Sequence, residues 1–573
     1  MNKIKINKYL VLLTVIFIVG TFFRFYKLGS IPPGPEWDEA SVGYNAFSIA
    51  QTGKDEWETR FPLIFQAFGD YKNPLYIYLT AIFIKFFGLN IITIRLTNVL
   101  AGSLFILVIY LIGSKIFNKK IGLLAILFLA LSPYGFFFSR ISGDGIMLSS
   151  FLVATGVLME INYLKSQRFL FFLLSIVFLM LSMFSYNLGR IVSPILLSIF
   201  FLINILNSQK LNKKLFLIPL LIILLAFYLI FKQSSLSLSS RMQYVGIFGA
   251  NKGLALEIDE FRGHDKNNLK SRLLHNKLTF TGITLLGNYL SHFSTDFLLN
   301  YKDHGNVSES HTPLLFMILL PFYYTGILFV FKELFKKNPK ERHFQIFILL
   351  FVLLIAPLPS TITEGAPSSK RSLALHGFIE LFTAFGLITT FSLLKQKLKI
   401  NKLFTFIVGV LLAINIGSFL YFFYWTYPQQ YGYIYAMREN KICEVIKTKY
   451  EQYDQFIFSR KIDGVPYIFP LFCLQFPPEK YWQTRQSRFI DGWHYVDSFD
   501  KFQFVDVVDE KIFDKLSTKK QIALFTNEEE KNTILPLLIE KKLISPNQQL
   551  IMTKPLINNP KLPLYLFTFK YEK

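Results

Sequence analysis

The sequence predicts an α-helical protein that crosses a membrane many times and ends in a small α/β domain. First, 52% of its 573 residues are hydrophobic and 17% are charged, and the mean hydropathy is +0.39. Second, apolar runs of about twenty residues, the length that a helix needs to cross a bilayer, recur as far as residue 425. Third, short lysine-rich segments separate those runs, whereas residues 428–573 are polar.

Twelve apolar segments are candidate spans. The first follows a basic start and has no small-residue cleavage site behind it, so we expect an uncleaved span. The segments are 8–26, 74–90, 95–113, 121–138, 145–163, 169–185, 190–206, 214–231, 312–331, 343–359, 372–394 and 402–425.

The basic residues between these segments decide which of them span. Six short clusters hold twenty lysines and arginines, and such residues gather in cytoplasmic loops. If 74–90 spans, seventeen of the twenty lie outside the cytoplasm; if it does not, all twenty lie inside. We therefore expect 74–90, which Lys85 interrupts, to be a helix in the membrane surface. About eleven spans remain.

This topology also predicts the domains. Residues 1–427 form the transmembrane domain, with outer loops at 27–94 and 232–311, and residues 428–573 form an extracytoplasmic α/β domain. In that domain strand-like runs such as YDQFIFS, KFQFVDVV, QIALFTN and LYLFTFKY alternate with the helix-like TILPLLIEKKLI.

Charge and cysteine usage exclude some classes of function. The net charge of +23 comes mostly from the cytoplasmic turns, since residues 428–573 hold 21 basic and 18 acidic residues, so we expect no nucleic-acid partner. The two cysteines, Cys443 and Cys473, have no CxxC or Cys/His spacing, so a structural zinc site is not expected. They could form a disulfide outside the cytoplasm or remain two thiols.

An acidic pair behind the first span is the leading candidate for chemistry. In IPPGPEWDEASVGYNA the prolines and Gly34 forbid continuation of the span and force a turn. That turn sets Asp38 and Glu39 near the boundary of water and lipid, where a lipid phosphate headgroup would lie. A carboxylate there can take a proton from an acceptor hydroxyl or amine.

Other polar residues gather in the outer loops of the same topology. An arginine at a span end can merely reach lipid phosphate, and an outer acid can merely be solvated. Their recurrence at one membrane face instead favours a site for a lipid-linked phosphate, which Arg and Lys would hold. The candidate substrate-binding residues are Asp70, Lys72, Arg95, Arg140, Asp144, Tyr186, Arg190, His292 and Arg371.

An ordered series of motifs resembles a known family. It comprises DEASVGYNA, GDYKNPLY, IRLTNVLAG, SPYGFFFSR, NYLSHFSTDFLLN and APLPSTIT followed by KR, spread through most of residues 9–425. Together they resemble glycosyltransferase family 39 of the GT-C enzymes, which includes protein O-mannosyltransferases and aminoarabinose transferases. Aminoarabinose transferases have adjacent Glu and Lys before two prolines, whereas here Tyr71 separates Asp70 from Lys72 and Asn73 replaces the first proline.

The resemblance implies a plasma-membrane transferase that moves a sugar from a polyprenyl phosphate to an extracytoplasmic acceptor, with inversion. Asp38 matches the family's proposed base, and Glu39 matches the second acid of the pair. Because phosphate is already a good leaving group, we expect no metal and no cofactor. Two alternatives stay open: a transporter or lipid flippase, and a non-catalytic assembly protein that binds a partner through its C-terminal domain. The sequence identifies neither the sugar, the acceptor nor the oligomeric state.

Overall fold

The computed structural model describes most of the chain. The described residues are 7–207, 254–265, 268–299, 313–337, 339–398, 401–430, 437–462, 464–490, 492–516, 520–544, 550–551 and 564–571, with single residues at 221, 224, 228 and 246. Almost all of the predicted span 214–231 and much of the outer loop 232–311 therefore lie outside the described residues.

The chain divides into two compact units that interleave in sequence. One, here the membrane unit, comprises Met1–Tyr26 and Asn98–Tyr421, and the other, here the loop unit, comprises Lys27–Thr97 and Phe422–Lys573. The predicted boundary at 427 is close to the second division of the chain. The first outer loop, however, groups with the C-terminal domain, whereas the sequence assigned it to the transmembrane domain.

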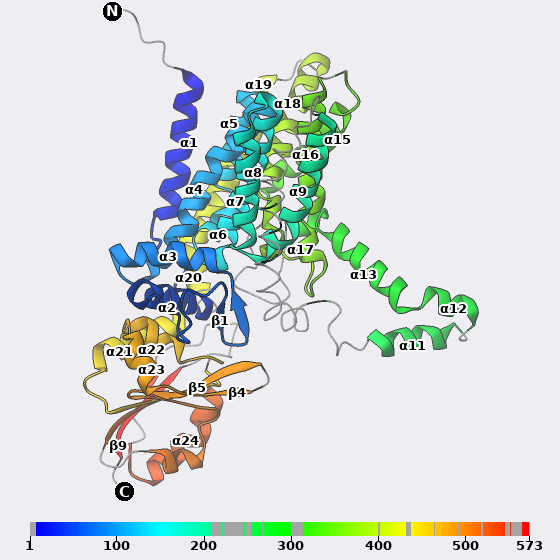
Figure 1. Ribbon diagram of the computed structural model, residues 1–573. Helices are drawn as coiled ribbons and strands as arrows, with labels where there is room; N and C mark the ends of the chain where they lie inside the picture. The colour runs from blue at the N-terminus through cyan, green and yellow to red at the C-terminus, as the bar shows by residue number, and fades with distance from the viewer. Residues whose placement is uncertain are drawn as a thin grey trace, which may run out of the picture. The chain divides into compact units, whose positions relative to one another are not determined.

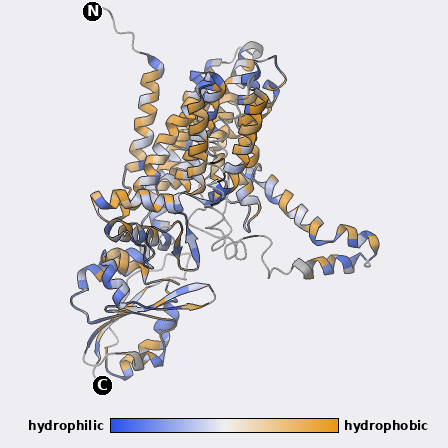
Figure 2. Ribbon diagram, viewed as in Figure 1, coloured by the Kyte–Doolittle hydropathy of each residue, from blue (hydrophilic) through white to orange (hydrophobic). Residues whose placement is uncertain are grey.

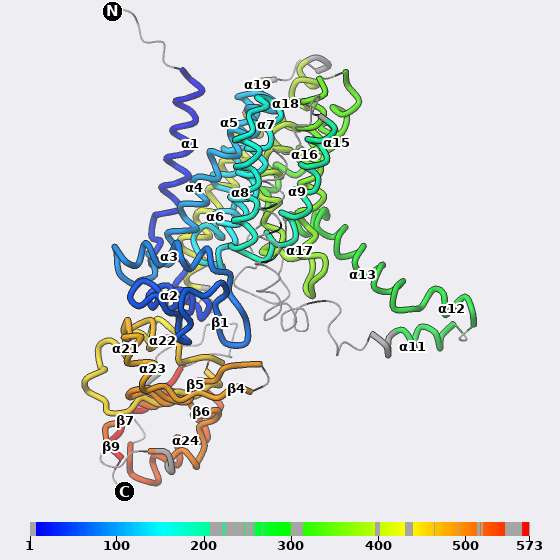
Figure 3. Tube along the Cα trace, viewed as in Figure 1, coloured from blue at the N-terminus to red at the C-terminus, as the bar shows by residue number. Residues whose placement is uncertain are grey.

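The membrane unit is a bundle of apolar helices (Figures 1 and 3). Hydrophobic residues dominate along them (Figure 2). They are α1 (Lys8–Phe25), α4 (Ile91–Ile116, in this unit from Asn98), α5 (Lys119–Ala130), α6 (Pro133–Ser139), α7 (Ile146–Ser166), α8 (Phe169–Met183), α9 (Asn187–Asn207), α15 (Leu320–Glu333), α16 (Lys340–Ile355), α17 (Leu358–Thr361), α18 (Phe378–Leu398) and α19 (Asn401–Tyr421). Shorter elements are η1 (Gly143–Gly145), α11 (Leu254–His264), α12 (Leu269–Leu274), α13 (Lys277–Ser291), α14 (Thr295–Leu299), η2 (Met317–Leu319) and η3 (Lys370–Leu375).

The described helices confirm a multi-pass membrane protein, and the total of about eleven spans stays a prediction. Seven are long and apolar enough to cross a bilayer, and α5 with α6, bent by 64°, makes an eighth if the pair is one span. The predicted spans 169–185 and 312–331 contain shorter helices, α8 of 15 and α15 of 14 residues. At 1.5 Å per residue these are about 21–23 Å long, less than the hydrocarbon core of about 30 Å.

Proline and length explain two of these outcomes. α15 begins only at Leu320 because Pro321, which lacks an N–H, occupies its first turn, and a short 3₁₀ turn precedes it. The segment 74–90 contains α3 (Pro74–Phe87), whose 14 residues span about 21 Å. That length agrees with a helix that does not cross the membrane, and its position in the membrane surface stays a prediction.

Glycines permit a close contact of the helices α15 and α18 in the membrane unit. A Cβ at Gly326 of α15 would lie 1.9 Å from the carbonyl oxygen of Phe382, and one at Gly386 of α18 would lie 2.0 Å from that of Phe322. Small residues let helix backbones approach in this way where lipid supplies no hydrophobic driving force.

The loop unit begins with the first outer loop. α2 (Trp37–Thr52) is followed by the antiparallel strands β1 (Phe65–Ala67) and β2 (Asp70–Lys72), then by α3 and the first residues of α4. Gly43 lets α2 pack closely, since a Cβ there would lie 2.8 Å from the Phe472 ring and 2.9 Å from Ile94. Phe472 belongs to α22 (Ile468–Cys473), so α2 packs on the C-terminal domain.

The C-terminal domain is built on a seven-stranded sheet of order β4-β5-β6-β3-β7-β9-β8. β3 (Gln455–Ser459) is parallel to β6 (Phe502–Val505) and β7 (Lys520–Thr526), and the other pairs are antiparallel. The remaining elements are β4 (Gln486–Ile490), β5 (Trp493–Phe499), β8 (Leu550–Ile551), β9 (Tyr565–Tyr571), η4 (Phe422–Thr426), α20 (Tyr427–Gln430), α21 (Met437–Lys449), α23 (Pro478–Thr484), η5 (Glu510–Lys515) and α24 (Glu528–Glu540). All four predicted strand runs and the predicted helix are confirmed.

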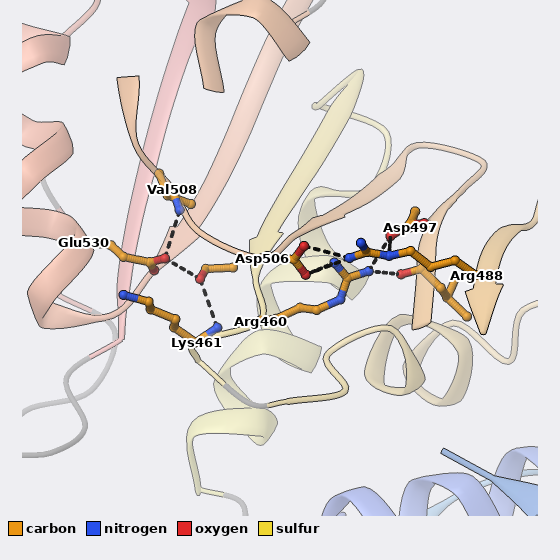
Figure 4. A network of polar contacts seen from close by, with 9 residues as sticks. Arg460, Lys461, Arg488, Asp497, Asp506, Val508 and Glu530 are labelled. Atoms are coloured by element: carbon orange, nitrogen blue, oxygen red, sulfur yellow. Dashed lines mark hydrogen bonds and ion pairs between the residues drawn. The ribbon is translucent and has the colours of Figure 1, made fainter. Parts of the chain in front are cut away.

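Two polar clusters tie this sheet together (Figure 4). Arg460 donates to Asp506 and Asp497, both at 2.8 Å, and Arg488 Nη2 donates to both carboxylate oxygens of Asp506 at 2.7 and 2.8 Å. In the second cluster, Glu530 accepts from the Ser459 hydroxyl at 2.6 Å and the Val508 N–H at 2.9 Å. Cys443 and Cys473 form a disulfide that links α21 to α22, which answers the question that the sequence left open.

Candidate functional site

Three of the predicted site residues meet in the loop unit. Lys72 Nζ lies 2.7 Å from Asp38 Oδ1 and 3.7 Å from Asp70 Oδ2. The lysine side chain is only 5% exposed, whereas the two carboxylates are 28% and 32% exposed. A nearly buried cation is thus held between two carboxylates that solvent, and therefore a substrate, can reach.

Local structure explains where Asp38 stands. The helix α1 ends at Phe25, and α2 begins at Trp37, after the stretch of prolines that was predicted to force a turn. Asp38 lies in the first turn of α2, where the helix dipole stabilises a carboxylate. Lys72 ends β2, so the short β1–β2 hairpin presents the lysine to the helix terminus.

The neighbour of Asp38 has a different environment. Glu39 forms a bidentate pair with Arg95, with Nε at 2.9 Å from Oε1 and Nη2 at 2.7 Å from Oε2. The two side chains are 1% and 0% exposed. Arg95 also donates to the carbonyl oxygens of Leu28 and Pro32 at 2.9 and 2.8 Å. This geometry fastens α2 and the proline turn to the start of α4, and it closes both groups to a substrate.

The remaining predicted residues lie in the membrane unit. Arg140, at the end of α6, is buried and donates to the carbonyl oxygens of Phe23 and Arg24 at 2.6 and 2.8 Å. Its guanidinium therefore holds the end of α1, a structural role that the sequence interpretation did not foresee. Asp144 is buried in η1 with a left-handed φ of 55°.

Two predicted loops of the membrane unit lie side by side. The hydroxyl of Ser185 donates to the carbonyl oxygen of Gly145 at 2.8 Å, which brings Tyr186 and Asp144 into adjacent loops. Tyr186 is buried, and Arg190, in the first turn of α9, is half-buried with its Nε 3.4 Å from the Met183 carbonyl oxygen.

His292 and Arg371 complete the predicted set. His292 is 1% exposed at the end of α13, and its Nδ1 lies 2.8 Å from the Asn288 carbonyl oxygen. Burial lowers the pKa of His292 to about 4, so this imidazole is neutral at pH 7. Arg371, in η3, is half-buried and donates through Nη1 to Thr363 Oγ1 and the Glu364 carbonyl oxygen at 2.8 and 2.7 Å.

Sequence reasoning missed a buried carboxylate in the loop unit. Glu56 is fully buried and accepts hydrogen bonds from the Tyr467 hydroxyl at 2.6 Å and from Asn45 Nδ2 at 2.8 Å. Burial raises the pKa of Glu56 to about 7. In the sequence this residue is one acid among several in KDEWETR, and its partner Tyr467 lies 411 residues away. No local pattern could have found the pair.

Comparison with known proteins adds a family. Residues 71–247 match the family model described as dolichyl-phosphate-mannose-protein mannosyltransferase, a range that includes Lys72 and Arg95. None of the curated proteins compared with the chain matches it.

Several solved structures are similar to this chain. The apo oligosaccharyltransferase of Archaeoglobus fulgidus has a TM-score of 0.48 and 13% identity over 82% of this chain and 64% of that chain. The chain thus spans less than two thirds of that protein's length. The same oligosaccharyltransferase, AglB, in complex with an inhibitory peptide and a dolichol-phosphate, has a TM-score of 0.48 and 14% identity over 81% of this chain and 63% of that chain. ArnT from Cupriavidus metallidurans, bound to undecaprenyl phosphate, has a TM-score of 0.45 and 10% identity over 97% of both chains.

The family match covers part of the transmembrane domain and the last part of the first outer loop. Residues 71–247 are thus similar to the dolichyl-phosphate-mannose-protein mannosyltransferase family, which confirms the family resemblance that the sequence indicated.

Proposed function

We propose that this protein is a membrane glycosyltransferase that moves a sugar from a polyprenyl-phosphate donor to an extracytoplasmic acceptor, which could be a protein, a lipid or a cell-surface polymer. The observation that carries the proposal is the contact of 2.7 Å between the accessible carboxylate of Asp38 and the nearly buried Lys72. The family match over residues 71–247 favours this reading over a transporter or flippase.

Each group of the contact has a part in the reaction. Asp38 takes the proton of the acceptor hydroxyl or amine while the acceptor atom forms a bond to C1 of the sugar. The bond between C1 and the phosphate oxygen breaks, and the lipid phosphate leaves with the electron pair, so the anomeric centre inverts. Lys72 neutralises the charge that develops on the leaving phosphate. Asp70, 3.7 Å from the same ammonium, holds Lys72 beside Asp38.

The ion pair of Glu39 and Arg95 supports the site by holding the first turn of α2, which bears Asp38. Both were predicted to act on substrate, but the arginine is fully engaged with a carboxylate and two carbonyl oxygens of the loop unit. We assign them a positioning role, which fixes the first turn of α2 and with it Asp38. In the membrane unit, Arg140 supports α1. Arg371 is half-buried and donates to Thr363 and Glu364, and its binding of phosphate stays a prediction.

The orientation belongs to the same proposal. The basic clusters predict that the C-terminal domain faces away from the cytoplasm in the plasma membrane, and the disulfide of Cys443 and Cys473 agrees with an oxidising compartment. Reporter fusions test it: a fusion after Lys214 should report the cytoplasm, and fusions at residues 260 and 500 should report the outside. A cytoplasmic reporter at residue 500 would contradict the orientation.

The proposal is tested with purified protein in vesicles and a radiolabelled polyprenyl-phosphate sugar. Transfer of label to an acceptor in a cell-envelope extract supports the transferase. Movement of the labelled lipid across the bilayer without transfer would instead establish the flippase alternative. If neither transfer nor movement occurs, the assembly role remains.

A further inference from the structure

The C-terminal domain holds the loop that bears Asp38, and it does so through the buried carboxylate of Glu56. Glu56 follows α2 and accepts from two elements of the loop unit at once. One donor, Asn45 Nδ2, belongs to α2. The other, the Tyr467 hydroxyl, belongs to the C-terminal domain, just before α22. We call Asn45, Glu56 and Tyr467 the Glu56 lock.

The lock is connected firmly to α2. Asn45 accepts the backbone N–H of Glu56 at 3.0 Å in addition to donating to its side chain at 2.8 Å, so the two residues form a reciprocal pair. Asn45 lies seven residues after Asp38, which is two helical turns and therefore the same face of α2. A helix transmits a displacement at one end to the other, so the lock sets the position of the first turn.

The C-terminal domain contributes further contacts around Glu56. Trp482 Nε1 and Arg485 Nη1 donate to the carbonyl oxygen of Glu56 at 3.2 and 3.0 Å. The guanidinium of Arg485 also lies over the ring of Trp57, 4.6 Å from its centroid. These contacts hold the backbone of Glu56 and the ring of Trp57 against α23 and the residue that follows it.

A second route leads from Tyr467 to the Lys72 side of the site. The ring of Tyr467 lies 6.0 Å from that of Phe68, which in turn stacks on Trp37, the residue before Asp38, at 6.0 Å. Phe68 also forms the turn between β1 and β2, and its carbonyl oxygen accepts the N–H of His494 of β5 at 3.3 Å. The next residue must be small, since a Cβ at Gly69 would lie 2.3 Å from the Trp493 indole.

We propose that Glu56 and Tyr467 are positioning residues, through which the C-terminal domain sets the reacting geometry of Asp38. The inference rests on the proposed function for its catalytic consequence, but the mechanical coupling of α2 to the domain does not. The domain is then part of the catalytic apparatus, and without the lock the accessible carboxylate loses its alignment with the acceptor.

Hydrogen–deuterium exchange of the full-length protein in lipid nanodiscs tests the coupling without any substrate. Glu56→Ala removes both side-chain bonds, and Tyr467→Phe removes one and keeps the ring. Backbone amides of residues 37–52 should exchange about tenfold or more faster in Glu56→Ala, because this variant loses two hydrogen bonds, each of which stabilises by roughly twofold to tenfold. Glu58→Ala, an exposed acid two residues away, and Tyr450→Phe, which loses a hydroxyl bond to Asp500, are the matched controls and should leave these amides unchanged.

Glu56→Gln distinguishes the lock from a general loss of folding. A glutamine can accept from Asn45 and donate to the Tyr467 oxygen, so this variant should exchange like the wild type. Unchanged exchange of α2 in both Glu56→Ala and Tyr467→Phe would overturn the inference, whatever happens to activity.

Transfer kinetics test the catalytic consequence. Tyr467→Phe should lower the single-turnover transfer rate about threefold to tenfold and leave donor affinity unchanged, because it moves the base and not the phosphate ligand. In an Asp38→Asn background the same change should have no further effect, since both variants act through one group. An equal additional loss in that background would overturn the positioning role. Faster exchange of α2 together with full activity of Asp38→Asn would support the coupling and overturn the proposed function instead.

Discussion

Two carboxylates in one loop have opposite surroundings. Asp38 is 28% exposed and forms an ion pair with Lys72, whereas Glu39, the next residue, is 1% exposed and bound bidentately by Arg95. Removal of either partner of such a buried pair destabilises the fold, because the other charge would remain desolvated. An exposed carboxylate can instead exchange its partner for a substrate. Adjacent acids of one motif can therefore have different roles.

The largest expected effect is on the open carboxylate. Asp38→Asn keeps the size of the side chain and removes the base, so the rate of sugar transfer should fall about 10²–10⁴-fold. Thermal unfolding and donor binding should stay close to those of the wild type. Transfer is measured with purified protein and labelled lipid-linked sugar. Near-normal turnover would remove the catalytic assignment and leave the pair with Lys72 as a surface contact.

The closed pair should respond in stability. Arg95→Ala leaves Glu39 buried without its cation and should reduce the free energy of unfolding by about 3–5 kcal/mol. Arg488→Ala, which breaks a largely exposed pair with Asp506 in the same unit, is the control and should cost about 1 kcal/mol or less. Denaturant unfolding followed by tryptophan fluorescence measures both. Equal stability of the two variants would mean that solvent reaches Glu39 and that it is not held in a buried pair with Arg95.

Lys72 is expected to act on donor binding. Loss of a hydrogen bond to a charged group costs roughly 1.5–3 kcal/mol, so Lys72→Ala should weaken donor affinity about tenfold to a hundredfold. Lys85→Ala, in the last turn of α3, is the control and should bind donor normally. Equilibrium binding of labelled donor to the Asp38→Asn protein, which does not consume it, gives the affinity. Equal affinities for the two lysine variants would contradict the phosphate role of Lys72.

A smaller effect is expected from pH. Burial raises the pKa of Glu56 from 4.5 to about 7, so the folded protein binds more protons than the unfolded chain between those values. The free energy of unfolding should therefore fall as pH rises through that window, by at most about 1.4 kcal/mol for each pH unit. Asp55 opposes ionisation of Glu56 while Arg485 and the Tyr467 hydroxyl favour it. Unfolding measured at several pH values should lose this slope in Glu56→Gln, and an unchanged slope would assign it to other groups.

The sequence predicted what depends on local pattern. Short strand-like runs of apolar and aromatic residues located β3, β6, β7 and β9, and long apolar runs located most of the spans. The β4–β5 hairpin was missed because QSRFI is mostly exposed and lacks that alternation. The division into units was also missed, since nothing local shows that residues 27–97 pack with a domain that begins near residue 422.

The candidate site also has features that the local sequence shows and features that depend on long-range contacts. The proline turn and the acidic pair are local, so Asp38 and Glu39 could be singled out together. Their roles could not be separated, because Arg95 lies 56 residues from Glu39 in sequence and Lys72 reaches Asp38 only through the β1–β2 hairpin. Tertiary contacts, not residue type, decide which acid meets solvent.

Chemical rescue tests the central claim, that the open carboxylate reacts and the closed one does not, most directly. The Asp38 side chain is 28% exposed, so Asp38→Ala leaves a space that a small carboxylate such as formate can enter from solvent. The Glu39 side chain is 1% exposed, so the space that Glu39→Ala leaves is closed to solvent. Single-turnover transfer is measured for Asp38→Ala and Glu39→Ala with rising formate, and sodium chloride at equal ionic strength is the control. Formate should raise the rate of Asp38→Ala about tenfold or more and leave that of Glu39→Ala unchanged. Rescue of Glu39→Ala but not of Asp38→Ala would contradict the central claim.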